Sequence, residues 1–135
     1  AGNVGAILRS ASAFGFTQVL ALKGTAALWS PKVLRAGMGA HFALRLVEGL
    51  ESETLAALQV PMLGTSSHAA QALHEVDLPW PCGWVLGHEG QGVSAALQRH
   101  CAMALRIPQP GGEESLNVAA AAAVCLYESA RQRAR

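Results

Sequence analysis

The sequence has little of several features that define common protein classes. Its 135 residues include three cysteines, an odd number without C-x-x-C spacing, so neither a disulfide framework nor a zinc site is expected. These cysteines are Cys82, Cys101 and Cys125. No apolar run reaches the length of a transmembrane helix, and no signal peptide can be recognised. We therefore expect a reduced, cytoplasmic setting and no membrane association.

The motifs of several enzyme classes are also missing. There is no G-x-x-x-x-G-K-[ST] segment, which excludes a P-loop nucleotide hydrolase, and no G-x-S-x-G elbow to carry a hydrolase nucleophile. The histidines show neither H-x-x-x-H nor H-x-H spacing, so we expect no metal site. They are His41, His68, His74, His88 and His100.

Charged residues are scarce, at 14% of the chain, whereas apolar residues make up 51%. This composition predicts one domain with a full core and a partly apolar surface that a second copy covers, so a homodimer is expected. The formal net charge of +1 gives no strong general attraction to nucleic acid. RNA or DNA binding would need local patches, a dimer groove or another domain. Arg131, Arg133 and Arg135 make the C-terminal end basic, and they either contact RNA or only complement the dipole of the last helix.

Helical and strand patterns alternate along the whole chain. A first helix is expected between Asn3, its N-cap, and Gly15, and a short second helix from Pro31, with Ser30 as N-cap, towards Gly37. Further helices are expected over 51–58, 68–74, 94–100 and 115–133, and strands over 18–22, 42–47, 60–65, 83–86 and 103–107. The strands are continuously apolar, which predicts an α/β fold: a parallel sheet covered by helices on both faces.

Three segments, 2–9, 87–92 and 107–117, gather polar side chains and free backbone N–H groups next to helix starts. Such places hold anions or polar ligands, so the sequence predicts a protein that handles a ligand. The segment 87–92 lies where a dinucleotide fingerprint would lie, between a strand and a helix. Glu89, however, stands where that fingerprint needs glycine, and its carboxylate repels phosphate. A nucleotide-dependent oxidoreductase is therefore disfavoured.

Each polar residue in these segments also has a plain structural interpretation. Arg9 is either an exposed helix arginine or a bidentate partner for a phosphate. Glu89 is either a solvated turn residue or an acceptor that faces a neutral or cationic ligand. Ser115 can be only an N-cap and Asn117 only a first-turn residue, and the acids just before them suit the helix dipole.

Taken together, the three segments resemble the SpoU (TrmH-type) family of RNA ribose 2′-O-methyltransferases, within the SPOUT superfamily. The first motif reads Asn-Val-Gly-Ala-Ile-Leu-Arg-Ser-Ala over 3–11, and the second reads Val-Leu-Gly-His-Glu-Gly-Gln-Gly over 85–92. The third joins Ile-Pro-Gln at 107–109, where methionine is usual in place of Gln109, to Ser-Leu-Asn-Val at 115–118 and an alanine-rich helix. Three motifs in this order and spacing are highly specific, and they span the whole chain.

The resemblance implies more than the composition does. It implies a parallel α/β sheet whose C-terminal part forms a deep trefoil knot, an obligate homodimer, and S-adenosyl-L-methionine as methyl donor. It also implies one methyltransferase domain over residues 1–135 that lacks an N-terminal RNA-recruiting part. Backbone groups would hold the donor at these positions: Leu63, Gly64, Thr65, Gly87, Ile107, Gln109 and Leu116.

The catalytic residues that the resemblance implies are Asn3, Arg9, Glu89, Ser115 and Asn117. Arginine is a poor base because its pKa exceeds about 12. Arg9 is therefore interpreted as holding an RNA phosphate and stabilising negative charge that develops on the ribose oxygen. Ser115 and Asn117 would hydrogen-bond the phosphate or ribose, and Glu89 would orient Arg9 or the asparagines.

Two functions remain open on this sequence. The first is an enzyme that transfers a methyl group to a ribose 2′-hydroxyl of rRNA or tRNA. The second is an RNA-binding assembly factor that keeps the knotted dimer without catalysis. The joint presence of Arg9, Glu89, Ser115 and Asn117 favours the enzyme, because a scaffold has no need of this polar set.

Overall fold

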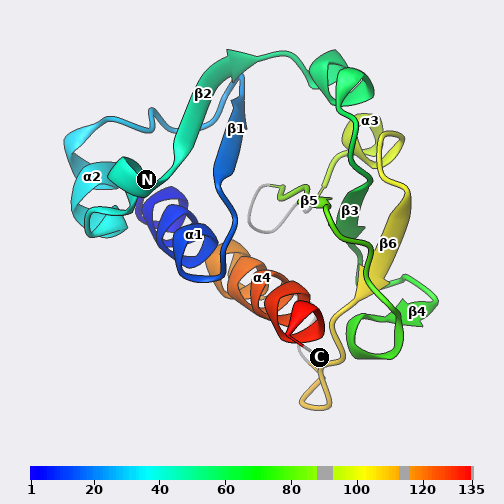
Figure 1. Ribbon diagram of the computed structural model, residues 1–135. Coiled ribbons are helices and arrows are strands. Elements are labelled where there is room, and N and C mark those ends of the chain that lie inside the picture. The colour runs from blue at the N-terminus through cyan, green and yellow to red at the C-terminus, as the bar shows by residue number, and fades with distance from the viewer. Residues whose placement is uncertain (88–92, 113–115, 135) are drawn as a thin grey trace. The chain divides into compact units, whose positions relative to one another are not determined.

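A computed structural model describes residues 1–87, 93–112 and 116–134 (Figure 1). The chain forms two compact units, Ala1–Thr54 and Leu55–Arg135. Every strand pair in the described residues is parallel, and helices alternate with the strands, which confirms the expected α/β class with parallel sheets. No helix within the described ranges combines the length and the apolar character needed to cross a membrane.

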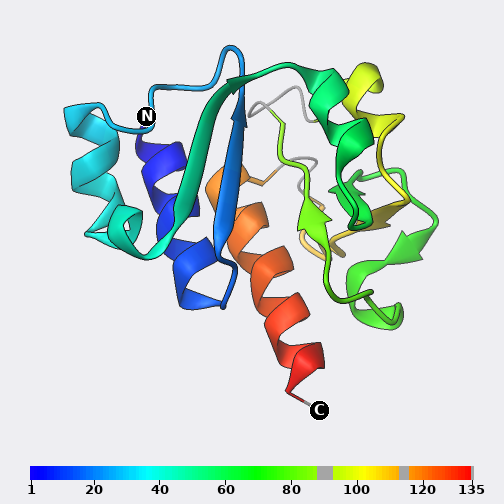
Figure 2. The ribbon, with the colours of Figure 1, turned by 45° about the horizontal axis from the view of Figure 1, so that its top comes forward.

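The first unit pairs two strands and packs two helices together (Figures 1 and 2). Its elements are α1 (Gly2–Ala13), β1 (Gln18–Leu22), α2 (Pro31–Gly37), the 3₁₀ turn η1 (Ala40–Ala43) and β2 (Arg45–Leu50). β1 runs parallel to β2, with Gln18 opposite Arg45. Where α1 meets α2, a Cβ added at Gly5 would lie 2.8 Å from the carbonyl oxygen of Val33, so only glycine allows this approach.

The ends of the first two helices test the capping predictions. Ser30 caps α2 as expected, because its Oγ accepts a hydrogen bond from the backbone N–H of Val33, and Pro31 is the first helical residue. Gly15 follows α1 with a φ of 84°, as a residue that ends a helix should. The prediction that Asn3 caps α1 is wrong. The helix begins at Gly2 with Ala1 as N-cap, so Asn3 lies in the first turn.

The second unit is built on a four-stranded parallel sheet with the order β4-β6-β3-β5 (Figure 1). The register places Leu63 of β3 beside Met103 of β6 and Trp84 of β5. Its elements after the 3₁₀ turn η2 (Ser52–Ala57) are β3 (Met62–Thr65), β4 (Gln71–Ala72), the 3₁₀ turn η3 (Leu73–Glu75), β5 (Gly83–Trp84), α3 (Ala95–Gln98), β6 (Met103–Arg106) and α4 (Val118–Arg133).

Helix α4 closes the core of the second unit. Cys125 is fully buried against Leu73 and Leu105, and this burial raises the pKa of the thiol to about 12. Glu128 is buried nearby and accepts two hydrogen bonds of 2.7 Å from Arg131. Gln132 joins the helix to the preceding connection, since it donates to the carbonyl oxygen of Val76 and its Oε1 accepts from the N–H of residue 78.

Basic residues at the end of α4 have partners within the same unit. Arg131 pairs with Glu128, and the guanidinium carbon of Arg133 lies 3.6 Å from the centroid of the Trp80 ring. RNA contact and complementing of the helix dipole both stay predictions for this cluster. Arg135 lies outside the described residues.

Several predicted elements differ from those observed. The helix expected over 68–74 is wrong: Gln71 and Ala72 form β4 because they pair with Leu105 and Arg106 of β6, and a 3₁₀ turn follows. The strand expected over 42–47 begins only at Arg45, after η1. The expected helix 51–58 is a 3₁₀ turn over 52–57, and the last helix begins at Val118 rather than at 115. Strand 60–65 is shortened to 62–65 and strand 83–86 to 83–84.

Candidate cofactor and catalytic site

The residues predicted to hold a cofactor follow three neighbouring strands. Leu63, Gly64 and Thr65 belong to β3, which lies between β5 and β6 in the parallel sheet. Gly87 follows β5, and Ile107 follows β6 directly. Parallel neighbours end at the same edge, and ligands of α/β sheets bind beyond the carboxyl ends of the strands. The topology therefore brings the three segments to one edge of the second unit's sheet.

The central strand of this edge is tightly packed. Leu63 is fully buried, and its carbonyl oxygen accepts a hydrogen bond of 2.8 Å from the N–H of Val85, which extends the pairing past β5 towards Gly87. A Cβ added at Gly64 would lie 3.1 Å from the sulfur of Cys101, so the backbone is closely approached here. On the other side of β3, the N–H of Ser66 donates to the carbonyl oxygen of Leu105.

The loop after β6 contains an unusual polar atom. The side-chain oxygen Oε1 of Gln109 is buried and has no hydrogen-bond partner among the described residues. The backbone oxygen of the same residue accepts a hydrogen bond of 3.0 Å from the N–H of Gly112, whose φ of 81° turns the chain. Ile107 and Leu116 are half-buried on either side of the loop. The sequence implied only backbone binding at residue 109, so the buried side-chain oxygen is a feature that it did not reveal.

Asn117 is the N-cap of α4. Its Oδ1 accepts hydrogen bonds from the N–H groups of Ala119, at 2.9 Å, and Ala120, at 3.1 Å. Asn117 is therefore not a first-turn residue, and its oxygen already serves the helix start. Ser115 and Glu89 lie outside the described residues.

The remaining two predicted catalytic residues lie on α1 in the first unit. Asn3 is half-buried in the first turn, and Arg9 is exposed six residues later. At 3.6 residues per turn these two positions lie on different faces of the helix, with about 9 Å of rise between them. Only the long side chain of Arg9 could reach across this separation to a ligand near Asn3, because the side chain of Asn3 is short. Among the described residues, Arg9 forms no ion pair.

A buried histidine, His41, also lies in the first unit, and no sequence motif marked it as functional. His41 is 2% exposed, and its Nε2 lies 2.6 Å from the carbonyl oxygen of Leu28. Its ring centroid lies 4.9 Å from that of Trp29, which is itself half exposed and contacts Phe42. Elsewhere in the described ranges, no three His, Cys, Asp or Glu side chains gather as metal ligands would.

Comparison with known proteins matches this arrangement to one family. The family model of the SpoU rRNA Methylase family matches residues 1–127. The 23S rRNA (guanosine-2′-O-)-methyltransferase RlmB of Pseudomonas putida is 36% identical over 135 residues, which cover 97% of this chain and 54% of that protein. The enzyme of the same name from Bordetella pertussis is 38% identical, with 97% and 55% covered. This chain thus spans about half the length of the curated relatives it matches.

Solved structures agree with the sequence matches. An RNA 2′-O ribose methyltransferase superposes with a TM-score of 0.88 at 39% identity, over 99% of this chain and 53% of the other. The SpoU methyltransferase AviRb from Streptomyces viridochromogenes, in complex with the cofactor AdoMet, gives a TM-score of 0.87 at 31% identity, over 98% and 56%. The chain belongs to the SpoU rRNA methylase family.

Proposed function

We propose that this chain is the catalytic part of an enzyme that transfers a methyl group from S-adenosyl-L-methionine to a ribose 2′-hydroxyl of rRNA or tRNA. The observation that carries the proposal is that β3, β5 and β6 end at a single edge of the sheet, where the predicted cofactor-binding segments lie, in a chain of this family. The names of the relatives support the substrate class, since they describe ribose methylation of 23S rRNA. We expect the enzyme to act in the cytoplasm, where these RNAs are made and used.

The described residues fit the proposed cofactor. Its adenosine carries N–H and O–H donors, and the buried Oε1 of Gln109 is an acceptor without a partner at the same edge. Half-buried Ile107 and Leu116 offer apolar contact to a planar base. S-adenosyl-L-methionine, when bound, supplies a methyl group on a positively charged sulfur.

The protein's own residues would then position the RNA. We assign Arg9 to an RNA phosphate and to the negative charge that develops on the ribose oxygen, because a guanidinium binds oxyanions in a bidentate manner and does not release its proton. Asn117 would donate from its amide, since its oxygen caps α4. Asn3, Ser115 and Glu89 are assigned to the same group as orienting residues. Holding the hydroxyl in line with the methyl group is a large contribution that such a site can make.

Two features of assembly belong to this proposal. The family membership, together with the resemblance described above, leads us to propose a C-terminal trefoil knot and a homodimer. The low fraction of charged residues agrees with a surface that a second copy covers. Sedimentation equilibrium tests the dimer, which should appear at twice the chain mass, and a monomer at all concentrations would contradict it.

Calorimetric titration with S-adenosyl-L-methionine, followed by methyl incorporation into bulk RNA, tests the activity. We expect binding with a one-to-one stoichiometry per chain and transfer to RNA. Arg9→Ala should abolish turnover while cofactor affinity stays nearly unchanged, because the residue is assigned to the RNA and not to the cofactor. Binding without transfer would favour the assembly factor, and equal loss of affinity and turnover in Arg9→Ala would contradict the role of Arg9.

A further inference from the structure

Charge is distributed unevenly along the chain. Residues 1–47 contain five basic residues and no Asp or Glu, because the first acidic residue is Glu48. Lys23 is paired with Glu51. Within the described residues, Lys32, Arg35 and Arg45 are exposed and form no ion pair. The first unit, Ala1–Thr54, also contains Glu48, Glu51 and Glu53, so its five basic and three acidic residues give a net charge of +2, against +1 for the whole chain.

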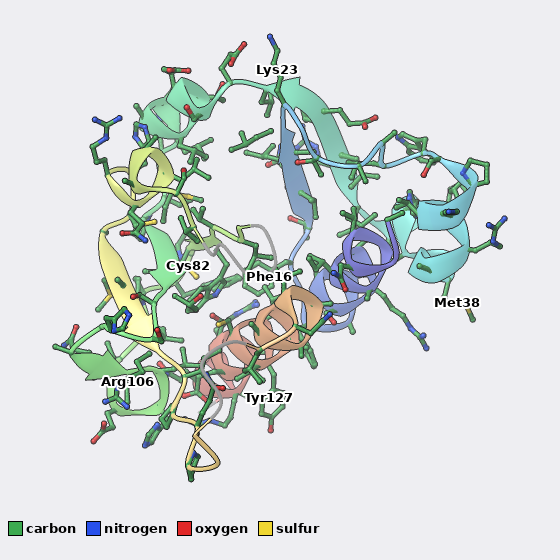
Figure 3. All side chains as sticks on the ribbon, turned by 180° about the vertical axis from the view of Figure 1, so that it is seen from behind. Phe16, Lys23, Met38, Cys82, Arg106 and Tyr127 are labelled. Carbon is green, nitrogen blue, oxygen red and sulfur yellow. The ribbon has the colours of Figure 1, made fainter. Side chains whose placement is uncertain are left out.

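Exposed aromatic rings lie in the same part of the unit. Phe42 is 83% exposed and Trp29 is 49% exposed, and their ring centroids lie 6.3 Å apart in an edge-to-face arrangement. We name these two residues the aromatic platform. Met38, 69% exposed, projects away from the end of α2 close by in sequence (Figure 3). A large exposed aromatic pair has no role in the core, and adjoining apolar surface with a polar rim marks an interaction site.

Contacts of the buried His41 hold the aromatic platform in a fixed position. The buried His41 ring packs against Trp29, and its Nε2 lies 2.6 Å from the carbonyl oxygen of Leu28, the residue before Trp29. The N–H of Leu28 in turn donates to Oε2 of Glu48 at 2.9 Å. The Glu48 carboxylate is thus engaged with the backbone next to Trp29. A side chain positioned in this way loses little entropy when it binds a ligand.

Cations flank both rings. Lys32 follows Trp29 by three residues and Arg45 follows Phe42 by three residues, so each Cα is at most about 11 Å from that of its ring. Arg35 lies one helical turn beyond Lys32 on the same face of α2. Rings with cations at this spacing suit a flexible polyanion that carries planar groups, which describes single-stranded RNA.

We propose that Trp29 and Phe42 form a stacking platform for unpaired RNA bases, with Lys32, Arg35 and Arg45 holding the phosphates on either side. The proposal rests on the proposed function and deepens it, because it names unpaired nucleotides as the part of the RNA that this unit binds. A second copy of the chain is a poorer occupant, since a two-fold interface would place these cations against one another. A protein partner would need an acidic face to match them.

Substitutions at Phe42 distinguish stacking from general apolar contact. Binding of the wild-type chain to a labelled, unstructured oligouridine and to an RNA duplex is measured by fluorescence anisotropy at low salt. Phe42→Ala and Phe42→Leu should each weaken oligouridine binding by about five- to a hundredfold, whereas Phe42→Tyr should bind like wild type, because only an aromatic ring stacks. Duplex binding should change less than twofold, since paired bases offer no free face.

Salt dependence tests the cations independently. The double variant Lys32→Gln/Arg35→Gln should reduce the slope of log affinity against log salt by about 1.4, because each phosphate contact to a single strand contributes about 0.7. Phe42→Ala should leave that slope unchanged. Lys23→Gln is the matched control, because Glu51 already neutralises Lys23. All of these positions are exposed, so the variants are expected to fold.

The proposal is overturned if the wild-type chain does not bind oligouridine, or if Phe42→Leu binds as well as Phe42→Tyr. It is also overturned if the variants change only self-association or binding to anionic vesicles, both measured in parallel. Affinity for S-adenosyl-L-methionine is determined on the same samples. If Phe42→Ala binds RNA as tightly as the wild-type chain does, the platform proposal is wrong. Normal cofactor affinity and normal RNA methylation in the same samples would show that the proposed function still holds.

Discussion

Asn117 is expected to serve both the start of α4 and the reaction, and substitutions can separate the two roles. Its Oδ1 accepts two backbone hydrogen bonds, of 2.9 and 3.1 Å, at an exposed helix start. Asn117→Ala removes both and should lower the free energy of unfolding by about 1 kcal/mol, the usual cost of losing such a cap. Asn117→Ser and Asn117→Asp keep a capping oxygen but lack the amide NH₂, so their stability should stay within about 0.5 kcal/mol of wild type.

Urea denaturation followed by circular dichroism gives the three stabilities, and methyl-transfer kinetics with calorimetry give turnover and cofactor affinity. All three variants should lose turnover, whereas cofactor affinity should fall little in the Ser and Asp variants. A stable Asn117→Ser enzyme with wild-type turnover would show that the amide takes no part in the reaction. An Asn117→Ala chain as stable as wild type would refute the argument that the cap supports α4.

Three further predictions concern the packing and the cofactor edge. Gln109→Leu should weaken S-adenosyl-L-methionine binding about tenfold, by calorimetry, and raise the stability of the ligand-free chain by about 1 kcal/mol, because it removes a buried oxygen without a partner among the described residues; unchanged affinity would contradict the contact. Gly5→Ala should destabilise by about 2 kcal/mol through its clash with α2, whereas Gly2→Ala, with nothing within 4 Å, should not; equal stability of the two in urea would refute this. The pKa of Cys125 is raised from 9.0 to about 12 in the folded chain. The unfolded thiol therefore ionises first, so stability should fall as pH rises from about 9 to 12, and less steeply in Cys125→Ala; identical slopes would contradict the burial argument.

Local chemistry made the first unit's elements largely predictable. The Ser30 cap and Pro31 at the first position located α2, and a short apolar run located β1 at 18–22. Asn3 was expected to cap α1, but a good capping residue can also occupy the first turn, and α1 already begins at Gly2. Phe42 was expected in a buried strand, yet Gly39, with a φ of 88°, turns the chain so that His41 takes the inner position and Phe42 the outer one.

The second unit shows where tertiary pairing overrides local pattern. Gln71 and Ala72 have no strand signal of their own and are extended because β6 offers them an edge. The order of β5, β3 and β6 brings the segments that the motifs singled out to one edge of the sheet, and cofactor binding by these segments stays a prediction. No motif could show that Oε1 of Gln109 is buried without a partner, since this depends on neighbours distant in sequence. The roles of Asn3, Arg9, Glu89, Ser115 and Asn117 remain predictions.

The position of the transferred methyl group tests the central claim most directly. The protein is incubated with RNA and S-adenosyl-L-methionine labelled in its methyl group, and the product is hydrolysed in alkali. A methyl group on the ribose 2′-oxygen blocks cleavage at that nucleotide, so the account predicts that the label is recovered in an alkali-resistant dinucleotide. Recovery of the label in single methylated nucleotides would place the methyl group on a base and would contradict the account.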